Sequence, residues 1–165
     1  MGEESVKEIL SSLSVERNPD VQRFMRKNAI PYEKSGNARS FLCMSDDGEP
    51  IGFFSLALNI LHLPETVKQR RKDKLTGFGR KDSKDVPCYL IGQLARFDGV
   101  SKEILSGDDM FAKIFEFLDI SRRFFGGRVL AIDCVDDLVS YYEDKGFFCV
   151  NKVDDLNHMA MVLGK

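Results

Sequence analysis

The sequence predicts an α/β protein in which helices cover both faces of one mixed, mostly antiparallel sheet. Short apolar runs typical of strands recur between residues 40 and 163, and amphipathic helical patterns precede and separate them. A predicted hairpin is followed by strand, helix, strand, helix and strand, which is the order of a mixed sheet with helices on its faces. The length of 165 residues fits one domain, and we expect residues 1–165 to form it.

The first 38 residues are expected to hold two helices and a loop. The first helix is marked by apolar residues at helical spacing: Val6, Ile9, Leu10 and Leu13. Asn18 followed by Pro19 is a typical start for the second helix. Residues 29–38 contain Pro31 and Gly36, and we expect them to form a loop.

A hairpin and a buried strand are predicted next. Residues 40–44 and 51–60 have the pattern of strands, and Asp46–Glu49 has the composition of a tight turn. Residues 87–96 form a third strand, whose continuous apolar run indicates burial on both faces. Residues 61–86 interrupt the pattern, and their glycines favour a mobile insertion.

The remaining chain alternates helices and strands. Ser106 with Asp109 three residues later resembles a capping box, and the helix that it starts ends at Gly126–Gly127. Residues 129–134 form a buried strand, and a short helix then ends at Gly146. The last two strands are expected at residues 147–150 and 158–163.

Composition excludes several classes of protein. The net charge is -2, which predicts no general attraction to nucleic acid or to an anionic membrane. No apolar run approaches the roughly 18 residues of a membrane span, and the acidic N-terminal sequence is not that of a signal peptide. The four cysteines form no C-x-x-C pair, so we expect free thiols, no metal site and a cytoplasmic protein.

The segment Lys68–Lys84 is strongly basic, with eight Lys and Arg residues and two acids. It allows three interpretations: a solvated loop, a wall of the acceptor pocket, or a contact with RNA. The rest of the chain carries a net charge of -8, because -2 minus +6 is -8. That acidity argues against nucleic acid as a partner, although contact through Lys68–Lys84 stays open.

Three local sequences resemble the GNAT superfamily of acetyltransferases. They are IGQLAR at residues 91–96, KEILSGDDMF at 102–111 and SYYEDKGF at 140–147. The resemblance covers about residues 40–163 and includes the order of the elements. It implies a sheet with splayed central strands and acetyl-CoA as cosubstrate. It also implies transfer of the acetyl group to a primary amine by direct attack.

The resemblance also implies roles for individual residues. Tyr142 would protonate the departing thiolate, which a neutral phenol can do. A backbone N–H near Leu94 would stabilise the oxyanion. The remaining cofactor contacts would come from the same strand, the loop after it and the start of the next helix, where free N–H groups attract phosphate. The residues expected to bind acetyl-CoA are Leu94, Ala95, Arg96, Lys102, Ser106, Gly107 and Asp108.

The phosphate loop departs from the family pattern. Leu105 stands where the family has its first glycine, and Lys102 stands where it has Gln or Arg. Two acids, Asp108 and Asp109, follow the remaining Gly107. We therefore expect weakened CoA binding. Beside the enzyme, the sequence allows a catalytically weak CoA-binding or interaction module.

The acceptor stays open between a small-molecule amine, a peptide amine and an aminoacyl-tRNA. The last would make the chain an acetyltransferase toxin, and the LPETVKQRRKDK segment resembles such toxins. No general base is identified: we interpret Asp133 as a surface acid rather than a base, and His158 as structural. Tyr142 at helical spacing from Leu138 also fits the core. Monomer and homodimer both stay open.

Overall fold

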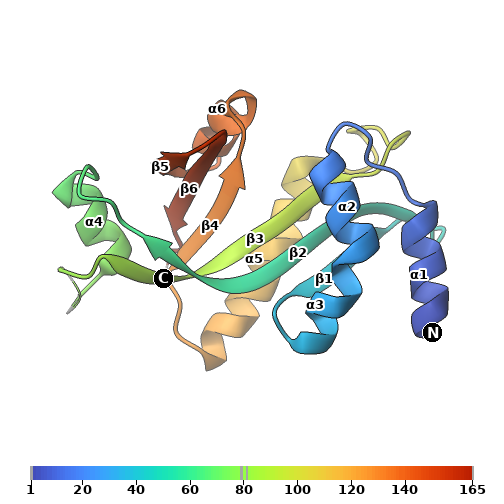
Figure 1. Cartoon of the computed structure of the whole chain (residues 1–165), viewed down its shortest axis with the longest axis horizontal. Helices are drawn as coiled ribbons and strands as arrows, with labels where there is room; N and C mark the ends of the chain where they lie inside the picture. Colours follow the sequence, from blue (N-terminus) through green and yellow to red (C-terminus); the bar gives the residue numbers. More distant parts are fainter. Residues whose placement is uncertain (1, 79, 81, 165) are drawn as a thin grey trace. The chain divides into compact units, whose positions relative to one another are not determined.

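The computed structural model describes residues 2–78, 80 and 82–164 (Figure 1). Its strands follow the hydrogen-bonded order β1-β2-β3-β4-β6-β5; among the described residues the pairs β1–β2, β4–β6 and β5–β6 are antiparallel and the pair β3–β4 is parallel. The expected mixed, mostly antiparallel sheet is therefore confirmed. The chain divides into two compact units, residues 1–57 with 92–125 and residues 58–91 with 126–165.

Three helices open the first unit: α1 (Glu3–Ser12), α2 (Pro19–Lys27) and α3 (Ala29–Ser35). The Asn18 side chain accepts a hydrogen bond from the Val21 N–H, so the predicted helix start is confirmed. The expectation of a loop over 29–38 is wrong for most of that stretch. Pro31 lies in the first turn of α3, where a missing N–H costs no helical hydrogen bond. Gly36 then ends the helix at φ +74°.

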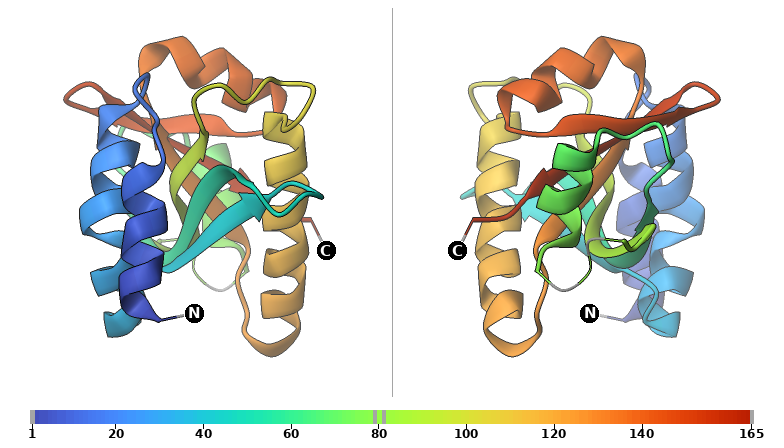
Figure 2. Two further views of the ribbon diagram at one scale, coloured as in Figure 1. Left: turned by 90° about the vertical axis from the view of Figure 1, so that its right-hand side faces the viewer. Right: turned by 90° about the vertical axis from the view of Figure 1, so that its left-hand side faces the viewer.

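The hairpin of the first unit consists of β1 (Arg39–Met44) and β2 (Pro50–His62). Adjacent residues of β2 point to opposite faces. Phe53 lies in the core under α1 and α2, whereas Phe54 stacks on Phe41 and lies against Phe117 of α5 (Gly107–Phe124). Figure 2 shows α1 to α3 on one side of β1 and β2 and α5 on the other. In this unit, helices cover both faces of the sheet, as predicted.

The second unit contains the end of β2, the start of β3 (Asp85–Arg96) and three further strands, which are β4 (Val129–Cys134), β5 (Phe148–Val153) and β6 (Leu156–Val162). β3 pairs with β4 through Tyr89–Ile91, and this pairing ends where β3 continues toward Arg96. A 3-10 turn (Asp136–Leu138) and α6 (Val139–Asp144) connect β4 to β5. Gly146 follows α6 at φ +94°, as predicted for its C-terminal end.

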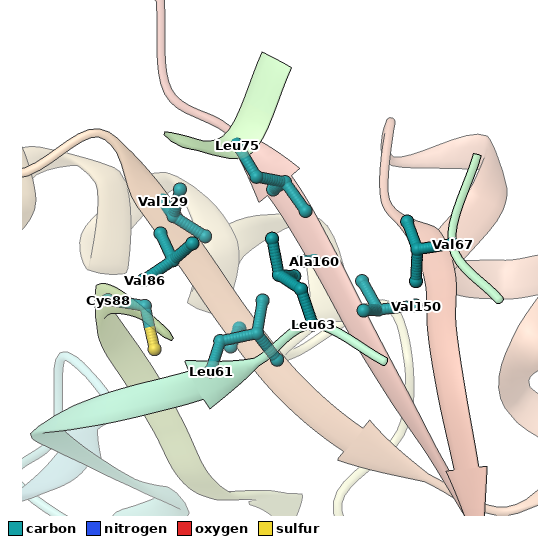
Figure 3. Close-up of a cluster of buried hydrophobic side chains, with 10 residues drawn as sticks. Leu61, Leu63, Val67, Leu75, Val86, Cys88, Val129, Val150 and Ala160 are labelled. Atoms are coloured by element: carbon teal, nitrogen blue, oxygen red, sulfur yellow. The ribbon is translucent and has the colours of Figure 1, made fainter. Parts of the chain in front are cut away.

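The mobile insertion expected over 61–86 is instead largely ordered, because it contains α4 (Gln69–Thr76). Leu75 of α4 is fully buried in an apolar cluster with side chains from β2, β3, β4, β5 and β6 (Figure 3). The Arg71 guanidinium lies 5.0 Å from the Phe148 ring and donates to the Cys149 carbonyl at 3.3 Å. The helix is thus anchored on the sheet of its unit. Gly79 and Lys81 lie outside the described residues.

None of the described helices combines the length and the apolarity that a membrane crossing requires.

Candidate active site

The end of β3 places the residues expected to contact the pantetheine arm. The Phe97 N–H donates to the Ile51 carbonyl of β2 at 3.1 Å. Alternate residues of a strand bond to the same neighbour, so the backbone of Ala95 also faces β2. Leu94 and Arg96 therefore direct their backbone groups to the opposite edge. This geometry favours Leu94 and Arg96 over Ala95 for binding an extended ligand.

The side chain of Arg96 holds the loop that follows. Its Nη1 donates to the Leu105 carbonyl at 3.0 Å, and its Nε is buried with no partner among the described residues. The Arg96 carbonyl accepts a hydrogen bond from Arg17 Nη2 at 2.7 Å. Leu105 is buried against Gly52, where an added Cβ would lie 2.5 Å from the leucine side chain. The hydrogen bond from Arg96 and the burial of Leu105 thus hold the phosphate loop against the hairpin and the end of β3.

Three N–H groups of the phosphate loop have partners within the protein. The N–H groups of Ile104 and Leu105 both donate to the Ser101 carbonyl at 3.2 Å. The Ser106 N–H donates to the Asp109 carboxylate at 2.8 Å. Leu105 has no positive φ, so the loop does not adopt the left-handed turn that glycine would permit. These three N–H groups are therefore already occupied and are not free to bind a ligand.

The start of α5 carries the predicted capping box. The Asp109 N–H donates to Ser106 Oγ at 3.1 Å, while the Asp109 carboxylate accepts from the Ser106 hydroxyl and N–H. These hydrogen bonds lower the pKa of Asp109, so a negative charge lies at the helix N-terminus. Gly107 is the first residue of the helix, and the exposed Lys102 lies in the preceding loop. The expected pyrophosphate site thus stays a prediction, and a carboxylate of the protein lies at the helix start where that anion was expected.

Tyr142 lies in the second unit, on α6. It is 6% exposed and packs edge-to-face against Phe147, with ring centroids 5.8 Å apart. Burial raises the pKa of Tyr142 well above its ordinary value of 10.0, and the neighbouring Cys134 thiol acts in the same direction. The phenol is therefore neutral at physiological pH, as a proton donor must be. Packing and acid chemistry are compatible in this side chain.

The second unit also pairs two residues that the sequence did not connect. Asp133 of β4 lies directly opposite His158 of β6, and His158 Nδ1 is 2.6 Å from Asp133 Oδ1. Both residues were predicted to have no catalytic part. Their pairing depends on strand register, and no local motif in the sequence carries that information.

Comparisons with known proteins identify the fold. No protein-family model and no curated protein matches the chain. A solved bacterial toxin has a TM-score of 0.71 at 17% identity, covering 88% of this chain and 78% of that one. AtaT complexed with acetyl-methionyl-tRNAfMet has a TM-score of 0.67 at 11% identity, covering 93% and 86%. AtaTR bound with AcCoA has a TM-score of 0.65 at 12% identity, covering 93% and 84%.

The chain has the GNAT fold. The resemblance noted in three short sequences thus extends over nearly the whole chain in three dimensions. The GNAT fold alone does not assign residues, so the roles of Leu94, Arg96, Lys102, Gly107 and Tyr142 stay predictions. The structure brings the first four of these onto one strand and the loop and helix after it, and places Tyr142 in the other unit.

The described part of the basic segment divides into paired and unpaired cations. Lys84 forms an ion pair with Glu65 at 2.9 Å, and Lys72 Nζ donates to the Glu65 carbonyl at 3.4 Å. Arg71 is held by Phe148 and Cys149, as described above. Four exposed cations form no ion pair with any described residue: Lys68, Arg70, Lys74 and Arg80. These four side chains are available to a negatively charged partner.

Proposed function

We propose that this protein is an acetyl-CoA-dependent N-acetyltransferase whose acceptor is the amino group of an aminoacyl-tRNA. The observation that carries the proposal is the fold shared with AtaT, which was solved in complex with acetyl-methionyl-tRNAfMet. A related structure, AtaTR, was solved with AcCoA. Free cysteines suit the reducing cytoplasm, where we place the reaction.

The chain supplies groups for each part of this reaction. Acetyl-CoA would bring the acetyl group as a thioester. Backbone N–H groups of Leu94 and Arg96 point to the edge of β3 that faces away from β2 and can stabilise a developing oxyanion. Lys102 and the N-terminus of α5 can hold the pyrophosphate. Tyr142, kept neutral by burial, can donate its proton to the departing thiolate.

The unpaired cations of the basic segment favour a nucleic-acid acceptor over a small amine. Lys68, Arg70 and Lys74 lie on or beside α4, which is anchored to the sheet rather than mobile. Cations on a fixed helix can contact successive phosphates without losing much conformational freedom. The acidic net charge weakens long-range attraction but leaves this local patch intact.

An acceptor panel tests the proposed function. The purified protein is incubated with radiolabelled acetyl-CoA and methionyl-tRNA, uncharged tRNA, free methionine, a short peptide or a polyamine. We expect label only in methionyl-tRNA, and we expect Tyr142→Phe to lose most of it. Transfer to the peptide or polyamine alone would overturn the assignment of tRNA as the acceptor. If label is transferred to none of the acceptors, the assignment of the protein as an enzyme is wrong.

A matched pair of single substitutions tests the basic segment. Arg70→Gln removes an exposed cation from α4, and Lys27→Gln removes one from α2. Neither cation forms an ion pair with a described residue. If α4 contacts tRNA, Arg70→Gln should flatten the log–log salt dependence of tRNA binding by roughly 0.7–0.9. Lys27→Gln should leave it unchanged. Equal slopes for both variants and the original chain would exclude α4 from the interface.

A second candidate function is a catalytically weak CoA-binding module, which the internally bonded phosphate loop favours. The two candidates differ in turnover rather than in binding. Acetyl-CoA binding by calorimetry, with no product from any acceptor at high enzyme concentration, would establish the module. Multiple turnovers per enzyme molecule would establish the transferase.

A further inference from the structure

A cavity of about 330 Å³ lies within the first unit, between the helices α1 and α3 and the hairpin of β1 and β2 (Figure 2). Its volume falls in the range of small-molecule sites, which are mostly apolar and carry a few polar groups. Apolar residues from all four elements line most of it, including Val6, Leu10, Ala29, Ile30, Leu42 and Phe53. The cavity is therefore suited to an apolar chain.

The polar groups with spare hydrogen-bonding capacity in this cavity are donors. The carboxylate of Glu33 already accepts from Arg39 Nη1 at 2.7 Å and from the Ser40 N–H at 3.0 Å. By contrast, the Ser40 hydroxyl is buried and has no partner among the described residues. The Lys34 ammonium has three N–H groups, one of which bonds to Glu3 at 3.0 Å. A ligand that binds here should therefore carry an acceptor group.

A second groove, of about 590 Å³, adjoins the cavity and is strongly basic. Glu3 and Lys34 line both hollows, and three further cations line the groove: Lys7, Arg26 and Lys27. Four cations and one acid give this lining a charge of +3, because 4 minus 1 is 3. Arg26 and Lys27 form no ion pair within the described part of the chain. This excess of positive charge attracts an anionic group to the side of the cavity where Lys34 lies.

We propose that the cavity binds a fatty acid or a similar single-chain amphiphile with an anionic head, which goes beyond the proposed acetyl transfer. The chain lies against Leu10, Ile30 and Phe53 and is removed from water there. The carboxylate accepts hydrogen bonds from Lys34 and Ser40. A neutral amphiphile would leave the basic groove unused, and a fully polar anion would leave the apolar cavity unused.

A series of ligands with one chain length tests the class of ligand. Decanoate, decanol and decylamine are titrated in a calorimeter, each below the concentration at which it forms micelles. We expect decanoate to bind at one site per chain and most tightly, and decylamine to bind most weakly. Acetate, which has the head without the chain, should not bind. Equal affinities for the three ligands, no binding of decanoate, or many decanoate molecules per chain would overturn the inference.

Two substitutions of opposite charge test the position of the head. Lys34→Gln should weaken decanoate binding roughly 2- to 5-fold, the range of an exposed ion pair. Glu3→Gln should tighten it by a similar factor, because it removes the carboxylate that competes for Lys34. Lys113→Gln and Glu116→Gln on α5 each break an exposed ion pair of 2.6 Å and should leave the affinity unchanged. Equal effects from the α5 variants would place the head elsewhere and contradict the inference.

Two further variants and one spectrum test the position of the chain. Ala29 is 2% exposed and lines the cavity, so Ala29→Leu should fill part of it and weaken decanoate binding roughly 10-fold or more. Ser40→Ala should also weaken binding, but it should not lower the stability of the ligand-free protein to urea, because the hydroxyl has no partner to lose among the described residues. Methyl NMR of the original chain needs no variant. Decanoate should shift the Leu10 and Ile30 signals and not those of Leu75, and the reverse pattern would overturn the inference.

Discussion

Tyr142 shows how a single side chain can serve both the core and the chemistry. Its ring packs against Phe147 and Tyr141, which fixes the position of the hydroxyl. The same burial destabilises the phenolate and raises the pKa. A buried tyrosine is therefore a donor whose protonation does not change across physiological pH.

Tyr142→Phe should retain the ring packing and remove only the proton donor. We expect kcat to fall by roughly 10²-fold or more while acetyl-CoA binding persists. In the original chain, Tyr142 should cause no falling limb below about pH 10, because the raised pKa keeps the phenol protonated. Stopped-flow acetylation from pH 6 to 10 checks both points. An unchanged kcat, with the chemical step shown to be rate-limiting, would mean that Tyr142 only packs in the core and donates no proton.

Cys88 and Cys134 should be unreactive in the folded protein. Burial raises the pKa of each thiol from 9.0 to about 11, so the reactive thiolate is about 100-fold scarcer than in an exposed cysteine. Alkylation with iodoacetamide at pH 8, followed by peptide mass spectrometry, measures each site. Both should be labelled rapidly in guanidinium. Rapid labelling in the native state would mean that these strands open readily.

At the scale of elements, α4 is the clearest test of the fold, because it was expected to be a mobile insertion. Leu75→Ala should destabilise the protein by about 2–4 kcal/mol, since the side chain is 0% exposed within the apolar cluster. Lys74→Ala, on the adjacent exposed position, should change the free energy of unfolding by less than about 0.5 kcal/mol. Urea unfolding measures both. Equal, small effects would mean that α4 is not anchored.

The N-terminus of α5 combines a helix cap with an expected phosphate site. Asp109→Asn removes the negative charge but retains a side chain that can cap. We expect acetyl-CoA to bind roughly 2- to 5-fold more tightly, because one carboxylate near a helix N-terminus contributes about 0.3–1 kcal/mol. Calorimetry measures the change, with Glu8→Gln on α1 as the control. Weaker binding to Asp109→Asn would place the pyrophosphate elsewhere.

The sequence predicted elements well where local chemistry determines them. Asn18 and Ser106 cap helices through their own side chains, and Gly146 ends one because it tolerates a positive φ. α3 was missed because Pro31 suggests a loop, although the first turn of a helix tolerates proline. α4 was missed because most of its residues are charged or polar, and the burial of its Leu75 side chain is not visible in such a pattern. The first error misread a local signal, whereas the second concerns tertiary packing that no local pattern reveals.

At the scale of the whole molecule, ligand binding should appear as added stability. A ligand present at 100 times its Kd stabilises the folded state by about 2.7 kcal/mol, a shift of a few degrees in Tm for a chain of this length. We expect acetyl-CoA to produce this shift and Gly107→Glu to abolish it through charge and bulk at the helix start. Differential scanning fluorimetry measures both. No shift at millimolar acetyl-CoA would exclude both candidate functions.

The candidate site was only partly predictable for the same reason as the fold. Tyr142 and Gly107 stand in short motifs that a sequence displays directly. Asp133 and His158 are 25 residues apart and meet only because β4 and β6 pair in one register. A shift of one residue would separate their side chains onto opposite faces.

The chain passes between the two compact units three times, twice within strands and once in the loop between α5 and β4. β2 passes from one unit to the other after Ala57, and β3 returns after Ile91. Each unit therefore consists of two separate stretches of sequence. No single break in the gene yields a fragment that encodes one complete unit and nothing of the other. Separating the two units completely would therefore require cuts at all three crossings.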